Sequence, residues 1–114
     1  MMQVASGAEG IERRREPRFA VPIRAKILGE TVMVRNWSLI GLRVVDFPAE
    51  LPNLDDEIRI RLILNHKALS VSIACWSDVV RVNPEQRTFA LHYTSVEPGD
   101  YELLETYTRI LSKN

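Results

Sequence analysis

The stretch EIRIRLILNHKALSVSIACWSDVVRV, residues 57–82, decides the fold of this chain. Apolar side chains occupy every second position from Ile58 to Leu64 and again from Leu69 to Cys75. A period of two is typical of a strand with one buried face. The segment Asn65–Lys67 between the two runs has turn composition, so the stretch predicts a pair of antiparallel strands. We expect residues 79–82 to extend the second strand past a bulge.

The same alternation predicts further strands on both sides of this pair. Shorter alternating runs occupy residues 21–28, 31–35, 42–45 and 88–93. Turns are predicted at Gly29-Glu30 and at residues 83–86, and a loop at residues 36–41. Residues 46–56 hold two prolines and four acids, which predicts a connection on the surface.

The last segment has a helical period. An apolar stripe, at the spacing of one helix face, is formed by Leu103, Leu104, Tyr107, Ile110 and Leu111. Two starts are open: Asp100 as the N-cap, or Glu97 as the cap with Pro98 at the first helical position. Six strands followed by one helix predict a mainly β fold, a six-stranded antiparallel barrel with a C-terminal α-helix and a flexible N-terminal arm.

Length and composition indicate one domain. The chain has 114 residues, of which 46% are hydrophobic, enough for a single core. We expect residues 1–12 to form a flexible leader and residues 13–112 to form the domain. The single cysteine, Cys75, excludes an intramolecular disulfide and has the parity of a core residue. No apolar stretch approaches the roughly 20 residues of a membrane helix and no signal peptide is visible, so we expect a cytoplasmic protein without membrane insertion.

Positive charge is concentrated in one part of the chain. The formal net charge is zero, yet residues 13–43 carry eight basic and two acidic side chains, whereas residues 44–114 carry seven basic and eleven acidic ones. Arginine outnumbers lysine twelve to three. Because Arg makes bidentate contacts with phosphate and guanine and stacks on flat rings, this pattern indicates an anionic partner bound at one place.

The sequence shows no enzyme constellation. His66 and His92 lack a second ligand at metal-site spacing, and Asp55-Asp56-Glu57 lacks the ligand spacing of a calcium loop. A phosphate-binding glycine loop is also missing. We therefore expect no enzymatic activity, no catalytic residue, no metal and no cofactor.

Two short segments stand out together. Arg14-Arg15-Glu16-Pro17-Arg18 precedes the first strand, and Asn36-Trp37-Ser38-Leu39-Ile40-Gly41 lies between the second and third. Each is a common composition by itself. Their order and their separation of about twenty residues, with strand patterns on both sides, are far more specific.

This arrangement resembles the PilZ domain, the bacterial receptor module for cyclic di-GMP. The resemblance runs from about Glu12 to Leu111, and the family signature is RxxxR followed by (D/N)xSxxG. Arg14 and Arg18 supply the first half, and the second is supplied by Asn36, Ser38 and Gly41. Two departures are mild: Asn36 stands where many members have Asp, and Ile40 where a second Gly is frequent. The first removes a charge that would pair with guanine donors, and the second stiffens the loop.

The resemblance implies a ligand site whose chemistry agrees with the residues. The site residues that we expect are Arg13, Arg14, Arg15, Arg18, Asn36, Ser38, Gly41 and Trp76. A guanidinium group can donate to guanine O6 and N7 at once or pair with a phosphate, and an Asn side chain can read the guanine amide edge. Ser38 can bond a phosphate or fix the turn, and Gly41 permits a positive φ or a close backbone approach.

The two tryptophans have different expected roles. Strand parity places Trp76 outward, where it can stack on a ligand or be covered by the C-terminal helix. Trp37 lies in the loop, and we expect its side chain to be buried as a packing plug beneath the site and not to be exposed.

The implied function is a cyclic di-GMP receptor that orders its N-terminal arm on binding and signals to an unidentified downstream protein. The alternative is a protein-interaction adaptor of the same fold without nucleotide binding. A third hypothesis, binding of single-stranded nucleic acid, is disfavoured by the pI of about 6.7 and by the scarcity of aromatic residues, so we expect no nucleic-acid partner. We expect a monomer or a ligand-dependent dimer.

Overall fold

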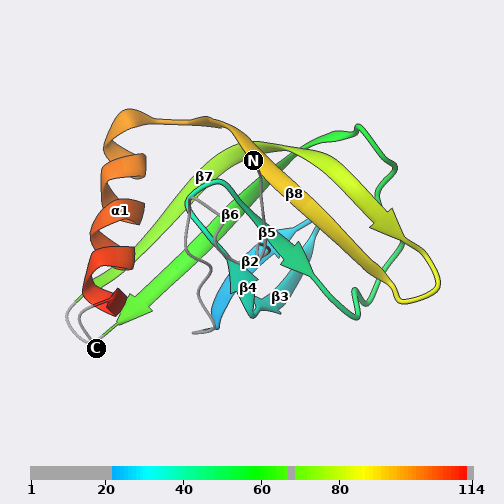
Figure 1. The fold of residues 1–114 in the computed structure, drawn as a ribbon, viewed down its shortest axis with the longest axis horizontal. Helices are drawn as coiled ribbons and strands as arrows, with labels where there is room; N and C mark the ends of the chain where they lie inside the picture. Colours follow the sequence, from blue (N-terminus) through cyan, green and yellow to red (C-terminus); the bar gives the residue numbers. More distant parts are fainter. Residues whose placement is uncertain (1–21, 67–68, 113–114) are drawn as a thin grey trace, which may run out of the picture.

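The structure is a computed structural model that describes residues 22–66 and 69–112. Seven strands and one helix follow one another (Figure 1): β2 (Ile23–Ile27), β3 (Glu30–Val34), β4 (Asn36–Trp37), β5 (Gly41–Val44), β6 (Glu57–His66), β7 (Leu69–Asn83), β8 (Thr88–Val96) and α1 (Pro98–Ser112). The predicted leader, residues 1–12, and the arginine arm, residues 13–18, lie outside the described residues. No described helix has the length and hydropathy to span a membrane.

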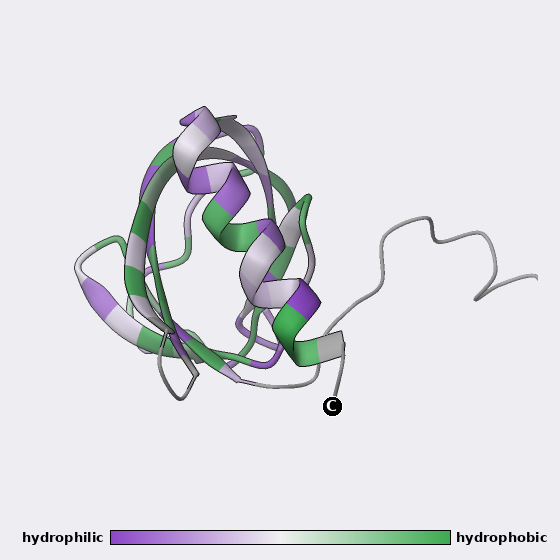
Figure 2. Cartoon of the chain, turned by 90° about the vertical axis from the view of Figure 1, so that its left-hand side faces the viewer, coloured by the Kyte–Doolittle hydropathy of each residue, from purple (hydrophilic) through white to green (hydrophobic). Residues whose placement is uncertain are grey.

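All strands belong to one antiparallel sheet in the order β3-β2-β6-β7-β8-β5-β4. The sheet curls into a nearly closed barrel, seen almost end-on in Figure 2. The predicted mainly β barrel with a C-terminal helix is therefore confirmed. The structure has one strand more than the six that we predicted. This strand is β4: Asn36 and Trp37, which we assigned to a loop, pair with Arg43 and Leu42.

The long β6–β7 hairpin confirms the alternation from which the fold was predicted. Ile60 pairs with Cys75, and both side chains are buried. The predicted bulge is present, since the pairing of β7 with β8 shifts between Trp76 and Ser77 and again after Val79. Asn65 and His66, which we predicted to lie in a turn, belong instead to β6 and pair with Ser70 and Leu69.

Two other turns are displaced by one residue from the predicted positions. The β2–β3 turn is formed by Leu28 and Gly29, at φ of 52° and 84°, whereas we predicted Gly29-Glu30. The β7–β8 turn occupies residues 84–87, and Arg87 has a φ of 55°. In both hairpins a residue in the left-handed region lets the turn match the twist of the strands.

The connection between β5 and β6 is only partly on the surface, contrary to our prediction. Phe47 is buried and meets Phe89 edge-to-face, with 5.1 Å between ring centroids. The Arg87 side chain donates to the carbonyl oxygens of Phe47 and Ala49. An aromatic side chain and an arginine therefore fix a segment whose prolines and acids predicted only exposure.

Helix α1 lies across one end of the barrel (Figure 2). It begins at Pro98, and the Tyr101 amide donates to the Glu97 carbonyl at 2.9 Å, so the Glu97–Pro98 start is confirmed over the Asp100 cap. Tyr107 is buried against Trp37, with 5.8 Å between ring centroids, and its hydroxyl donates to the Asn65 carbonyl at 3.0 Å. Trp37 therefore joins the helix to the barrel.

Candidate functional site

The candidate site is built on residues 36–41, which comprise β4, the connection at residues 38–40 and the first residue of β5, and which we call the loop. Ser38 is fully buried, its amide donates to the Gly41 carbonyl at 2.8 Å, and its Oγ accepts from the Ile40 amide at 3.2 Å. Of the two roles that we considered for Ser38, fixing the turn is the one seen in the structure. The loop conformation is thus determined by its own hydrogen bonds.

Gly41 lets this loop lie directly against β8. A Cβ built on Gly41 would overlap the Leu91 carbonyl oxygen and come within 3.2 Å of the His92 ring. Two hydrogen bonds hold the same contact: the Tyr93 amide donates to the Ile40 carbonyl at 3.0 Å and the Tyr93 hydroxyl to the Gly41 carbonyl at 3.3 Å. The close backbone approach is therefore the reason for glycine here.

Trp37 lies under the loop as the predicted plug. Its side chain is fully buried, whereas Asn36 beside it is exposed. Successive residues of a strand point to opposite faces, so burying Trp37 directs Asn36 outward. The burial of Trp37 therefore orients the Asn36 amide, which can donate and accept hydrogen bonds, toward the outer surface.

Strand register places an arginine beside Asn36 that sequence reasoning did not select. Asn36 pairs with Arg43, which pairs with Ala90 on β8, and Ala90 pairs with Arg81 on β7. A hollow of about 220 Å³ lies on this row, between Arg43 and Arg81. Strand parity in the sequence indicates that Arg43 points outward. Its pairing with Asn36 could not be predicted, because β4 has only two residues and the apolar alternation does not reveal it.

His92 is a second neighbour of the loop that we did not select as a site residue. It pairs with Gly41, and its exposed ring lies next to the position that a Gly41 Cβ would take. The imidazole therefore flanks the loop on the outer surface of β8. The His92 ring adds a polar group beside the candidate site.

Trp76 points outward, as its strand parity predicts. It is 39% exposed, and the Arg59 guanidinium carbon lies 5.7 Å from its ring centroid. Trp76 lies two residues along β7 from Asp78, which pairs with His92, the partner of Gly41. Trp76 and the loop therefore belong to neighbouring parts of one barrel wall.

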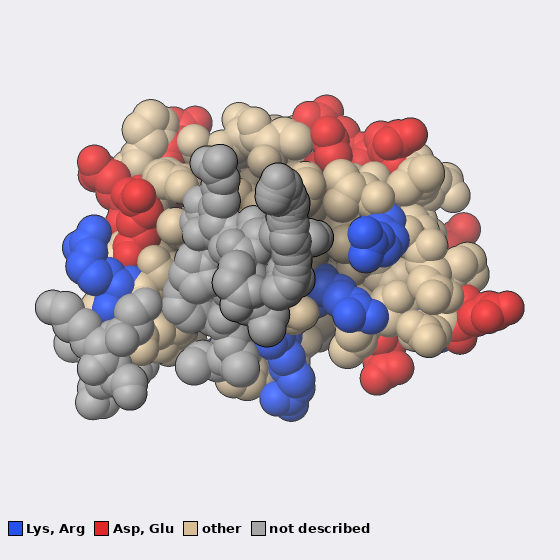
Figure 3. Space-filling model, in the orientation of Figure 1, with Lys and Arg blue, Asp and Glu red and all other residues tan. Residues whose placement is uncertain are grey.

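The arm residues Arg13, Arg14, Arg15 and Arg18 lie outside the described residues. The structure thus brings together Asn36, Ser38 and Gly41, with Trp76 one strand beyond β8. On the face shown in Figure 3, basic side chains lie right of the middle, at the lower edge and at the left end beside acidic ones, and further acidic side chains lie along the upper edge and at the right.

Groups that could perform metal or thiol chemistry are not assembled in the part of the chain that the structure describes. Within residues 22–66 and 69–112 no group of three or more His, Cys, Asp or Glu residues is placed to hold a metal ion. Burial raises the pKa of the Cys75 thiol, which keeps it protonated near neutral pH. The chemistry available at the loop is hydrogen bonding, charge and stacking.

Comparison with known proteins agrees with this arrangement. The model of the family described as "PilZ domain" matches residues 12–109. No curated protein matches the chain. Among solved structures, the Bacillus subtilis inhibitor of motility (MotI/DgrA) superposes with a TM-score of 0.73 at 22% identity, over 91% of this chain and 54% of that chain. This chain therefore spans about half the length of that protein, with which it shares its fold.

Proposed function

The chain belongs to the PilZ domain family, and we propose on this basis that it is a non-catalytic receptor for cyclic di-GMP that signals through a partner protein. The observation that carries the proposal is that both halves of the family signature lie intact within the matched residues. Arg14 and Arg18 form the first half, and Asn36, Ser38 and Gly41 form the second.

The geometry of the loop supports the proposal. Ser38 and Gly41 hold the loop in one conformation, and the exposed Asn36 amide can donate and accept at a guanine edge. A loop that is already fixed loses little conformational entropy on binding. Arg43 and His92 add polar groups on either side, and the Trp76 ring offers a stacking surface.

The arm supplies the positive charge that two phosphates require. We expect Arg14 and Arg18 to contact phosphate or guanine O6 and N7, with Arg13 and Arg15 beside them, and ligand binding to order the arm against the barrel. Ordering costs about 1–2 kcal/mol per residue fixed. Micromolar or somewhat tighter affinity, about −8 kcal/mol or better, is therefore expected. The ordered arm would change the surface offered to the partner protein.

Isothermal titration calorimetry with purified protein tests the proposal. Cyclic di-GMP should release heat and saturate, whereas cyclic di-AMP, which lacks the guanine O6 acceptor, should bind at least about tenfold more weakly. Arg14→Ala, Arg18→Ala and Asn36→Ala should each lower affinity about tenfold or more, because each removes contacts worth roughly 1–3 kcal/mol.

Arg109→Ala is the matched control, because it removes the same charge from the exposed face of α1 and should leave affinity unchanged. Absence of heat with correctly folded protein at high micromolar ligand would contradict the proposal. That result would leave the adaptor function, in which the barrel binds a partner protein without nucleotide.

A further inference from the structure

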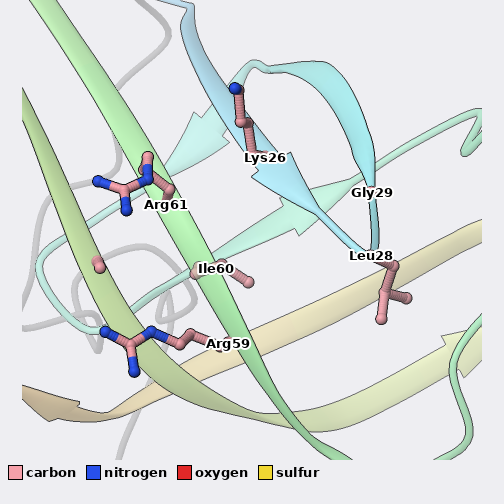
Figure 4. Close-up of a pocket in the computed structure, with 7 residues that line it drawn as sticks. Lys26, Leu28, Gly29, Arg59, Ile60 and Arg61 are labelled. Carbon is pink, nitrogen blue, oxygen red and sulfur yellow. The ribbon is translucent and has the colours of Figure 1, made fainter.

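The outer surface of β2 and β6 carries a cluster of cations away from the loop. Lys26 pairs directly with Arg61 across the two strands, and Arg59 lies two residues before Arg61 on the same face. Figure 4 shows Arg59 and Arg61 projecting from one side of β6, with Lys26 on the neighbouring strand. The three side chains, with Leu28 and Gly29, line a hollow of about 310 Å³. We call Lys26, Leu28, Arg59 and Arg61 the cationic face.

The charges of the cationic face are not compensated within the described chain. Like charges directly opposite each other in a sheet are destabilising, yet Lys26 and Arg61 occupy such a pair. Arg61 donates to the Ser72 hydroxyl at 3.0 Å, and Arg59 lies over the Trp76 ring. None of the carboxylates in residues 22–66 or 69–112 forms an ion pair with these three cations. The arrangement therefore has a cost that an acidic partner would offset.

Leu28 gives a second, independent indication. It adopts a φ of 52° in the β2–β3 turn and is 45% exposed. Two-residue turns of this kind favour Asn, Asp or Gly, because other side chains are strained in the left-handed region. A leucine that is both strained and exposed contributes little to folding. Its position at the edge of the hollow gives the cationic face an apolar contact, and Trp76 borders it on the other side.

We propose that the cationic face docks an acidic segment of a partner protein, with the partner's carboxylates on Lys26, Arg59 and Arg61 and an apolar side chain against Leu28. Arg and Trp beside an exposed aliphatic residue form the composition typical of protein interfaces. Along the sheet, β7 and β8 lie between this face and the Asn36–Gly41 loop on one side, and β3 lies between them on the side where the barrel nearly closes. This docking goes beyond the proposed nucleotide binding and does not depend on it.

The probe is a synthetic ten-residue peptide of alternating Glu and Leu, titrated into the ¹⁵N-labelled full chain and followed by NMR. Amide shifts should concentrate at residues 26–29 and 59–61. The variants Lys26→Glu and Arg61→Glu should each weaken binding about tenfold, since each replaces an attraction by a repulsion. Arg109→Glu, the same charge change on α1, should leave peptide affinity unchanged, and the peptide with Lys in place of Glu should not bind.

Leu28→Asn separates docking from folding. Asn suits the turn, so the variant should fold at least as stably as the wild type while binding the peptide several-fold more weakly. Three results would overturn the proposal: no shift at the cationic face with millimolar peptide, tighter binding of a single-stranded oligonucleotide than of the peptide at the same residues, or loss of cyclic di-GMP binding in Lys26→Glu and Arg61→Glu. The first two results are measured without nucleotide, so they still test the docking proposal if the wild type fails to bind cyclic di-GMP, and the two proposals fail independently.

Discussion

At the scale of single residues, Gly41 suits its backbone surroundings, whereas Leu28 does not suit its backbone conformation. Gly41 lacks a Cβ because β5 passes so close to β8 that a methyl group would overlap the Leu91 carbonyl. Leu28 keeps a large side chain although its φ of 52° favours glycine or asparagine. The first residue permits a contact that the fold needs, and the second bears strain that the fold does not need.

Gly41→Ala should destabilise the protein. The added methyl meets backbone rather than a flexible side chain, so β5 must shift and the loop hydrogen bonds must weaken. Overpacking of this kind costs about 1–3 kcal/mol, which urea denaturation measures as a lower midpoint. Gly99→Ala is the control, because its Cβ meets nothing within 4 Å and alanine is the better helix former. Equal stability of wild type and Gly41→Ala would show that the close approach is not needed.

Leu28→Asn should raise stability. A left-handed conformation costs an ordinary L-residue roughly 1–2 kcal/mol, and Asn recovers part of it. We expect an increase of about 0.5–1 kcal/mol, because the exposed leucine contributes little packing. Thermal unfolding followed by circular dichroism gives the comparison. A lower melting temperature than wild type would mean that Leu28 is a packing residue, and it would remove one of the two arguments for the docking surface.

At the scale of secondary structure elements, α1 closes the barrel by packing on the core residue that orients Asn36. Tyr107 contacts Trp37 and donates to the Asn65 carbonyl, so the helix, β6 and the loop share one contact. Burial raises the pKa of Tyr107. The docking of the helix therefore favours the neutral phenol.

Tyr107→Phe tests this contact through its pH dependence. At neutral pH the variant should lose about 0.5–1.5 kcal/mol with the hydrogen bond. Above pH of about 10 the unfolded chain releases the phenol proton while the folded protein retains it, so wild-type stability must fall as pH rises. The difference between wild type and variant should then shrink. Urea denaturation at pH 7 and near pH 10.5 measures it, with Tyr101→Phe on the same helix as control. A constant difference would show that Tyr107 is not buried as the structure has it.

The elements that could be predicted from sequence are those with long, regular alternation. The hairpin of β6 and β7 follows from eight alternating apolar positions, because a one-residue slip would turn all of them to solvent. β4 could not be predicted, because its two residues, Asn36 and Trp37, are too few to show an alternation of apolar and polar side chains. The burial of Phe47 could not be predicted either, because it depends on Arg87, forty residues away.

At the scale of the whole molecule, the barrel presents two separate surfaces. The loop at β4 and β5 carries the signature residues Asn36, Ser38 and Gly41, and the cationic face lies on β2 and β6, with β7 and β8 between them on one side and β3 on the other. Trp76 on β7 borders both regions. Under the two proposals, the nucleotide would bind on one wall of the barrel and the partner protein on another.

The motif in the sequence was enough to select the candidate site residues, whereas their neighbours in space could be identified only from the structure. Asn36, Ser38 and Gly41 follow from the motif, and the outward direction of Trp76 follows from parity. Arg43 and His92 become neighbours of the loop only through the register of β5 with β4 and β8. Register depends on how the whole sheet closes, which a local pattern does not contain.

The most direct test of the central claim is an NMR titration of the ¹⁵N-labelled chain with cyclic di-GMP. The claim is that arginines of the arm and the fixed loop contact one nucleotide ligand. We predict large shifts for the amides of residues 13–18 and 36–41 and for the Trp76 indole, with the amides of α1 nearly unchanged. Shifts confined to other parts of the barrel, or no shift at saturating nucleotide, would contradict the account.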